Sequence, residues 1–418
     1  MKHVSILASL VLAATAAFAA PQVVFKPVPA ALLAQANSEK ILVYGPQYGG
    51  TYMQGQWKAG KILVQALASY AGNRDADKPL LAQLRAVLKG DAAICGNGGY
   101  SAQHERMYTT AVVMAKNTPE VWSQLTDKEK HKLDLLMKAS LIGAAVTTND
   151  KMFSDKKARK TATCMDGDTN FYRDWNPNHR EGAIGGLIAG ACYFGPAEAQ
   201  KFLDTYDHEK FCEELKAADL ENPYKIFSGQ LPHKKSKGLL TPDEINNAVH
   251  GFTYYNMTLA DAMKIYLSLV TNTYSGTVAA GLNDGEGIDG GGKIAAGADE
   301  LPNKGKKGML KEFASIDEGG KRSCVKYCYG GFRPDMANLL TLVTSGKFEF
   351  DNPEWKEAFA LMKVGNEDLF YKLDKGYICY SHGKAETAPI TYDPKRDFAM
   401  MRDLWLQTIL PTLEANTK

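Results

Sequence analysis

The sequence predicts an all-α fold, namely an α/α toroid of helical hairpins with long loops and little β-structure. Three observations predict it. Apolar residues recur at helical spacing, as in 62–70 and 133–142. Strand signals are few, and residues 41–44 give the clearest one. Long glycine-rich loops such as 283–308 separate the helices, which favours stacked helical hairpins over a βαβ fold.

Residues that start and stop helices predict the other elements. Gly195 followed by Pro196 predicts a helix beginning at that proline. Thr241 as N-cap, Pro242 as the first helical residue and Glu244 at the third helical position together form a capping box. Further helices are expected over residues 259–271, 335–344, 354–364 and 397–413.

The first twenty residues follow the order of a signal peptide: a short basic start, an apolar run and small residues. The pattern Ala17-Phe18-Ala19 predicts cleavage after Ala19. Residues 1–19 are then the signal peptide, and 20–418 form a single α/α-toroid catalytic domain. We therefore expect a secreted protein, either extracellular or periplasmic, with no membrane span.

The charge balance points away from nucleic acid. The chain has 49 Lys and Arg against 47 Asp and Glu, a formal net charge of +2, so it is not a generally basic nucleic-acid binder. Basic clusters at 151–160, 233–237 and 304–311 are either solvated loops or a positive rim that attracts a polyanion. A polyanion is the partner that such a rim would attract, and a monomer is the expected state.

Cysteine usage is consistent with secretion. In an oxidising compartment disulfides are expected, and an odd number of cysteines leaves at least one thiol. Cys324 and Cys328 could form a local bridge, but no second pair at metal spacing accompanies them, so zinc is not expected. The seven cysteines are residues 95, 164, 192, 212, 324, 328 and 379.

The most informative segment is 167–182, which gathers polar, aromatic and charged residues just before an apolar helix. Asn178 and His179 are expected at the entrance of that helix, where unsatisfied N–H groups and the macrodipole stabilise an anion. Alternatively, Asn178 caps the helix and His179 is an ordinary polar residue. Four glycines predict close packing of this helix against a neighbour: Gly182, Gly185, Gly186 and Gly190.

A second cluster, 322–335, precedes another helix that starts near Pro334. Its tyrosines, Tyr327 and Tyr329, either present a hydroxyl to a substrate or pack into the core with that hydroxyl satisfied. Arg322 supplies a cation in the same loop.

Together the two clusters resemble the active-site elements of α/α-toroid polysaccharide lyases, most of all the alginate and glucuronan lyases of polysaccharide lyase family 38. In such enzymes an Asn-His pair opens an inner helix, while a tyrosine and an arginine come from a later segment. The resemblance implies that Asn178 and His179 are that pair. It matches Tyr329 and Arg322 to the later elements, with Tyr327 as the rival tyrosine.

The implied reaction is β-elimination on a β-1,4-linked polyuronate, either alginate or its polymannuronate, or glucuronan. Asn178, helped by His179 or Arg322, would neutralise the uronate carboxylate and stabilise the enolate-like intermediate. Tyr329 would remove the C5 proton and return one to the leaving oxygen, with His179 as the alternative base. No cofactor is required. A divalent cation could replace Arg322, and the acidic loop residues that permit such a site are Asp284, Glu286 and Asp289.

Further residues in the two clusters are expected to hold the sugar chain. Trp175 and Tyr172 could stack on sugar rings, although core packing is an equally good reading for each. The other expected substrate-binding residues are Arg173, Arg180, Tyr327 and Arg333.

Two other classes of function remain open. A glycoside hydrolase on the same toroid would use two carboxylates, and Asp168, Asp174 and Glu181 are available near the aromatic loop. A noncatalytic protein that binds acidic glycans would use the same aromatic and basic residues without any turnover.

Overall fold

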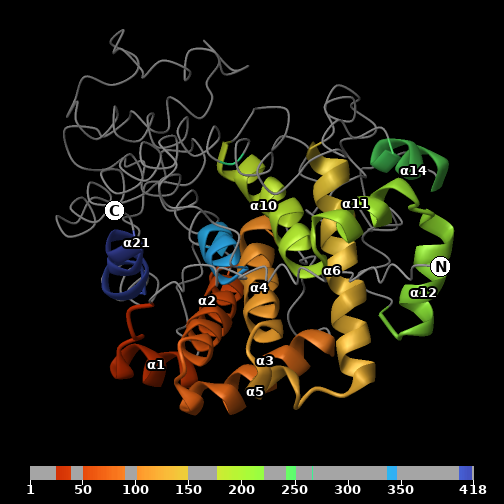
Figure 1. The fold of residues 1–418 in the computed structure, drawn as a ribbon. Helices are drawn as coiled ribbons and strands as arrows, with labels where there is room; N and C mark the ends of the chain where they lie inside the picture. The colour runs from red at the N-terminus through yellow and green to blue at the C-terminus, as the bar shows by residue number, and fades with distance from the viewer. Residues whose placement is uncertain are drawn as a thin grey trace, which may run out of the picture.

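A computed structural model describes residues 25–38, 50–89, 101–148, 177–220, 242–250, 266, 337–345 and 404–416. Within these ranges the regular structure is helical throughout, without a strand (Figure 1). The expectation of an all-α protein is therefore confirmed for this part of the chain. The toroidal arrangement stays a prediction, and the strand expected over 41–44 lies outside the described residues.

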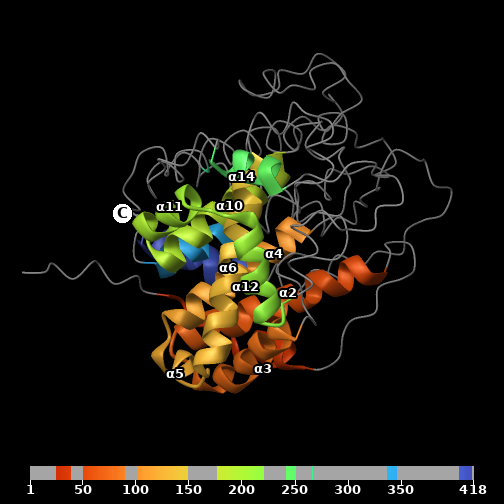
Figure 2. The same ribbon diagram turned by 90° about the vertical axis from the view of Figure 1, so that its right-hand side faces the viewer.

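Long helices pack side by side at the centre of the molecule (Figures 1 and 2). α10 packs along both α6 and α4, and α4 also packs along α2. The helix over 337–344 lies against α4, where Thr110 Oγ1 donates to the carbonyl oxygen of Ala337 at 2.9 Å. The bounds of the labelled helices are Gly50–Tyr70 for α2, Ser101–Lys116 for α4, Asp127–Thr148 for α6 and Pro177–Phe194 for α10.

Apolar side chains from these helices form the core. The helical spacing noted over 62–70 places Leu63 and Leu67 on the buried side of α2, where both are fully shielded from solvent. Val112 on α4 and Leu141 on α6 are buried equally well. Burying each such side chain contributes about 1.5–3 kcal/mol, which outweighs the weak intrinsic helix preference of valine and glycine in these segments.

The N-terminal edge is built from shorter helices. α1 (Ala30–Asn37) packs on α2, and Gln65 Nε2 on α2 donates to the carbonyl oxygen of Ala36 at 3.2 Å. After α2, the 3-10 turn η2 (Arg74–Ala76) leads into α3 (Asp77–Leu88), and α5 (Pro119–Trp122) packs against α3.

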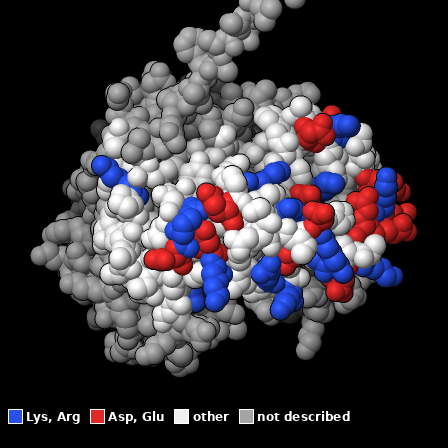
Figure 3. All heavy atoms as spheres, turned by 60° about the horizontal axis from the view of Figure 1, so that its bottom comes forward, with Lys and Arg blue, Asp and Glu red and all other residues white. Residues whose placement is uncertain are grey.

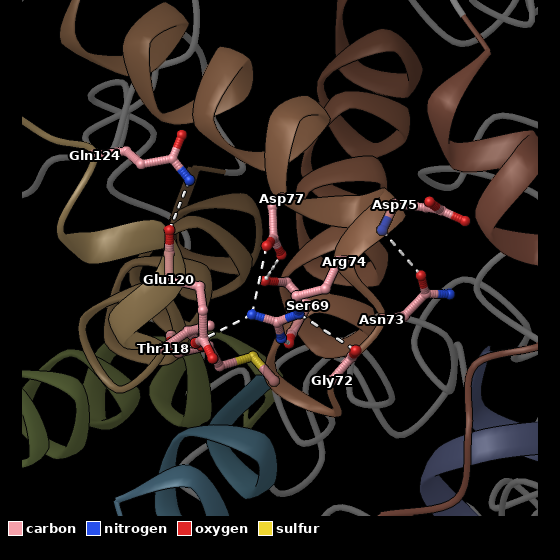
Figure 4. Close-up of polar contacts among 10 residues, drawn as sticks. Ser69, Gly72, Asn73, Arg74, Asp75, Asp77, Thr118, Glu120 and Gln124 are labelled. Atoms are coloured by element: carbon pink, nitrogen blue, oxygen red, sulfur yellow. Dashed lines mark hydrogen bonds and ion pairs between the residues drawn. The ribbon is translucent and has the colours of Figure 1, made fainter.

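Arg74 joins the end of α2 to α3 and α5 (Figure 4). Its guanidinium donates to the carbonyl oxygens of Gly72, at 3.3 Å, and of Ser69. It also forms ion pairs with Asp77, at 3.4 Å, and Glu120, at 3.1 Å. The Ser69 hydroxyl in turn donates to Asp77 at 2.6 Å, so one cation satisfies groups from several helix ends.

A second group of helices follows α10: α11 (Pro196–Asp204), α12 (His208–Ala217) and α14 (Pro242–His250). α11 packs on α10, α14 packs on α6, and both α11 and α12 contact α14. The predicted helix starts at Pro196 and Pro242 are both confirmed. Gly195 makes the turn between α10 and α11 at φ +89°, a value that glycine adopts most readily. Asn246 accepts a hydrogen bond from the backbone N–H of His208 at 2.9 Å, which joins α14 to α12.

The C-terminal helix differs from the single helix expected over 397–413. A π-helical turn, η5 (Trp405–Ile409), precedes α21 (Leu410–Asn416). Pro411 explains the difference, because proline has no N–H to donate and its ring clashes with the carbonyl group four residues earlier. Thr412 Oγ1 on α21 accepts a hydrogen bond from the backbone N–H of Lys26 at 2.8 Å, so the two ends of the described chain meet.

Other expected helices are only partly visible. Residues 337–344 confirm most of the helix predicted over 335–344. Tyr266 is helical and fully buried within the helix predicted over 259–271, whereas 354–364 lie outside the described residues.

The described surface in Figure 3 carries intermingled acidic and basic side chains. Such mixing agrees with the small net charge of the chain and gives no single-sign field on this face. Among the described helices, none is both long and apolar enough to cross a membrane.

Candidate functional site at the start of helix α10

α10 begins at Pro177, so the predicted helix entrance is confirmed. Proline suits the first helical position because its missing N–H has no intrahelical partner there. Asn178, His179 and Arg180 follow within the first turn. Asn178 therefore lies in the first turn of the helix, one residue after its start, and its role stays a prediction. The first turn carries the positive end of the helix dipole, which favours a negatively charged group nearby.

Contacts along α10 give its direction relative to its neighbours. Arg106, early in α4, lies beside the first half of α10, and Lys116, at the end of α4, lies beside Tyr193. α4 therefore runs parallel to α10. On α6 the order is reversed, because Ala144 lies beside Gly186 and the earlier Asp134 beside Tyr193. The N-termini of α4 and α10 consequently lie at the same end of the bundle.

The glycines of α10 bring this helix close to its neighbours, as the sequence predicts. A Cβ atom added at Gly186 would lie 2.6 Å from both the Cβ of Ala144 and Nη1 of Arg106. A Cβ at Gly190 would lie 2.7 Å from Cδ1 of Leu141. Contacts below 3.0 Å are not sustained by real Cβ atoms, so any larger residue at Gly186 would move α10 away from α6.

Arg106 fills the space beside these glycines and was not found by sequence reasoning. Its side chain is 2% exposed, and Nη2 donates to the hydroxyl of Ser140 on α6 at 2.9 Å. A Cβ at Gly185 would meet both Cδ of Arg106, at 2.7 Å, and Oδ1 of Asn338. The sequence signal for it is slight, because Arg106 ends the polar run Gln103-His104-Glu105 and directly precedes the mainly apolar stretch 107–115.

The other end of α10 is fixed by a separate set of contacts. The Tyr193 hydroxyl donates to Asp134 Oδ1 at 2.6 Å. Burial is the main cause that raises the pKa of Tyr193, and the hydrogen bond to Asp134 raises it further. Lys116 Nζ donates to the carbonyl oxygen of Tyr193 at 2.7 Å and lies 3.8 Å from the centre of its ring. Burial lowers the pKa of Lys116, while Asp134 opposes that shift. A cation at this helix end complements its dipole.

A third polar cluster surrounds His208 at the start of α12. Tyr206 Oη lies 2.7 Å from Nδ1 of the imidazole, and Cys212 Sγ lies 3.5 Å from Nε2. Burial lowers the pKa of His208 to about 4, against a smaller raising effect of Asp207. The ring is therefore neutral at pH 7 and suits a structural role. Cys212 and Cys192 are present as thiols; the other five cysteines lie outside the described residues, so disulfides stay a prediction.

Most of the predicted site residues lie outside the described part of the chain. Within the described ranges no group of three or more His, Cys, Asp and Glu side chains could hold a metal ion. Glu181, one of the proposed hydrolase carboxylates, belongs to α10. The residues that lie outside the described chain are Asp168, Tyr172, Arg173, Asp174, Trp175, Asp284, Glu286, Asp289, Arg322, Tyr327, Tyr329 and Arg333.

Comparison with known proteins gives one informative similarity. The chain is 33% identical over 328 residues to a gellan lyase from a Bacillus species, and the match covers 75% of this chain. It spans 12% of the length of that relative. No known family's sequence profile matches the chain, and no solved structure does. This chain is thus similar to one part of a much longer polysaccharide-degrading enzyme, and family 38 membership stays a prediction.

Proposed function

We propose that this protein is a secreted polysaccharide lyase that cleaves an acidic polysaccharide by β-elimination. The observation that carries the proposal is the 33% identity, over three quarters of this chain, to a protein named for lyase activity on a polysaccharide. The signal-peptide pattern at residues 1–19 supports secretion. The Asn-His pair in the first turn of α10 supports the chemistry.

In the proposed reaction a base removes the C5 proton of a uronate, and the electron pair forms the C4–C5 double bond as the C4–O4 bond breaks. The departing O4 takes a proton, so the products are a new chain end and an unsaturated uronate. The carboxylate must be neutralised for C5 to be acidic enough. Asn178, with His179 or Arg322, has this role, and preorganised donors of this kind supply several kcal/mol of transition-state stabilisation.

The position of the pair favours that role. Backbone N–H groups in the first turn of a helix have no intrahelical acceptor, and the dipole of the 18-residue helix α10 is positive there. The N-terminus of α4 lies at the same end of the bundle and adds a second positive helix end. An anionic carboxylate is therefore favoured near Asn178 over a neutral sugar.

The remaining roles follow the resemblance stated from the sequence. Tyr329 is the proposed base and acid, with Tyr327 as its rival. Trp175 and Tyr172 are proposed to stack on sugar rings, and the arginines at 173, 180 and 333 to hold carboxylates. The proposed substrates are polymannuronate and glucuronan, and gellan joins them because of the relative's name.

A substrate panel tests the proposal. The purified chain is incubated separately with gellan, alginate, polymannuronate, polyguluronate and glucuronan, and the ultraviolet absorbance of unsaturated uronate is followed. We expect absorbance to rise with at least one polymer. New reducing ends without that absorbance would instead support a hydrolase that uses Asp168, Asp174 or Glu181. Binding without any product would support a noncatalytic protein.

Variants at the start of α10 separate catalysis from folding. His179→Ala should lower kcat at least about 100-fold, because general acid–base or electrostatic groups contribute factors of that size. His131→Ala is the matched control, since His131 is an exposed histidine on α6 and lies outside the proposed site. Equal activity of the two variants would remove His179 from the mechanism.

A further inference from the structure

Arg106 is a buried cation that the proposed mechanism does not use. We infer that Arg106 is a positioning residue for the proposed elimination site: it sets the place of the first half of α10, and with it the place of Asn178 and His179. This inference rests on the proposed function. Arg106 acts through the helix and does not itself touch the sugar, because its side chain is 2% exposed.

The contact between Arg106 and α10 is unusually close. Nη1 and Cδ of Arg106 occupy the space that Cβ atoms would take at Gly186 and Gly185. Ser140 on α6 accepts a hydrogen bond from Nη2 at 2.9 Å, which fixes the direction of the guanidinium. α10 therefore rests on a planar group that is itself held by α6, and the separation of these helices depends on that group.

Helical periodicity connects this contact to the proposed catalytic pair. Position 178 precedes Gly185 by seven residues, and position 179 precedes Gly186 by the same interval. Seven residues are close to two full turns, so each pair of positions lies on the same side of α10, about 10 Å apart along its axis. A shift or tilt of α10 at the glycines is therefore transmitted directly to the first turn.

Stability alone does not favour arginine at this position. Burying a cation carries a large desolvation cost, and replacing buried charged groups with apolar side chains of similar size is often neutral or stabilising. The guanidinium instead offers a rigid, directed group, which suits the control of distance between helices. A displacement of about 1 Å can lower a reaction rate about 100-fold, so small changes at Arg106 are measurable in kcat.

The test compares matched buried variants of the full chain. Arg106→Met removes the guanidinium, and Thr110→Val is its control. Thr110 is one turn further along α4, and its buried hydroxyl bonds to Thr341 at 2.6 Å on helix 337–344 instead of reaching α10. We expect Arg106→Met to lower kcat at least tenfold with KM within threefold, and Thr110→Val to stay within twofold of the wild type. Arg106→Lys should recover only part of kcat, because its flexible ammonium lacks the planar group that lies beside Gly186.

A second pair keeps the inference testable if Arg106→Met does not fold. Gly186→Ala forces a Cβ against the immobile Cβ of Ala144 and against Arg106, so α10 must move. Gly190→Ala is milder: it meets the terminal Cδ1 of Leu141 at 2.7 Å, which can rotate, and the Cβ and Cγ of Leu141 at 3.2 Å, which need give only slightly. A tenfold lower kcat in Gly186→Ala but not in Gly190→Ala supports the inference. Equal kcat in these two variants, or in Arg106→Met and Thr110→Val, overturns it.

Hydrogen exchange separates this inference from the proposed function. Peptides covering residues 181–188 should exchange faster in Arg106→Met than in Thr110→Val, because the first half of α10 loses its support. If the wild type cleaves no polymer, the proposed lyase function fails, while this comparison still decides whether Arg106 places α10. Unchanged exchange in Arg106→Met would refute that role regardless of activity.

Discussion

The buried imidazole of His208 should make this protein sensitive to acid. With the ring proton assigned to Nε2, the Tyr206 hydroxyl donates to Nδ1 across 2.7 Å, and Nε2–H points to Cys212 Sγ at 3.5 Å. The neutral ring is thus satisfied on both sides, and the residue is 3% exposed. Protonation would place a charge where little water can reach it, which is why the pKa of His208 is lowered to about 4.

The contribution of His208 to the free energy of unfolding follows from the difference between its pKa values in the folded and unfolded states. In the unfolded chain the pKa of histidine is about 6.5, so the folded value of about 4 corresponds to a shift of about 2.5 units. At about 1.4 kcal/mol per unit, the neutral ring contributes about 3 kcal/mol. Between these two pKa values the unfolded state binds more protons. The contribution is therefore complete above about pH 6.5 and is lost as the pH falls toward 4.

Two measurements check this prediction. NMR titration of the His208 ring should give a pKa near 4, and the signal is assigned by its absence in His208→Gln. The difference in unfolding free energy between wild type and His208→Gln, from denaturant melts between pH 4 and 7, should grow by about 3 kcal/mol up to pH 6.5 and then level off. A flat difference across this range, or a ring that titrates near pH 6.5, would refute the reasoning.

Three substitutions give simpler expectations, each measured by denaturant or thermal unfolding. Tyr193→Phe removes the hydroxyl that donates to Asp134 at 2.6 Å and should cost about 1–3 kcal/mol, whereas no loss would mean that water replaces the bond. Gly195→Ala meets no atom within 4 Å but must adopt φ +89°, so it should cost about 1–3 kcal/mol from backbone strain alone. Glu120→Ala breaks the ion pair to Arg74, and because 60% of the Glu120 side chain and 41% of the Arg74 side chain are exposed, about 1 kcal/mol or less is expected. That loss should shrink in about 1 M salt, and a salt-independent loss would contradict an ionic origin.

The sequence predicted best those helices that carry clear boundary residues. Pro196 and Pro242 each begin a helix, and Pro177 begins α10 just before the Asn-His pair. α1 and α3 were missed, and both lack a side-chain cap, since the residues before them are Pro29 and Ala76. Tertiary packing stabilises such helices without leaving a local signal.

α12 was also not predicted from the sequence, although it has a capping residue. Asp207 accepts a hydrogen bond from the backbone N–H of Lys210 at 3.1 Å and caps this helix, which is a recognisable boundary signal. Its helical pattern could therefore have been found from the sequence. The π-helical turn before Pro411 is subtler, because proline indicates a local disturbance without indicating its form.

For the candidate site, the sequence indicated close packing but not its partner. Gly185 and Gly186 predicted that another group approaches α10, and the structure confirms it. That the group is the guanidinium of Arg106 depends on how α4 and α10 align in space, and no local pattern encodes that alignment. Long-range pairing of this kind is settled by the packing of the whole core.

The contacts along the two halves of α10 are expected to have different effects, one on the stability of the fold and the other on the position of the helix. α4 and α6 each contribute a polar side chain beside each half of α10. Near the first half, Arg106 of α4 donates to Ser140 of α6. Near the second half, Lys116 of α4 and Asp134 of α6 each bond to Tyr193. The contacts at Tyr193 satisfy a helix carbonyl and a buried hydroxyl, so their loss should appear chiefly as lower stability. The contact at Arg106 fills the space beside the glycines of α10, where Nη1 and Cδ lie at the positions that Cβ atoms would take. Because its main effect on α10 is geometric, its loss should appear chiefly at the first turn, where a small displacement changes the proposed chemistry most.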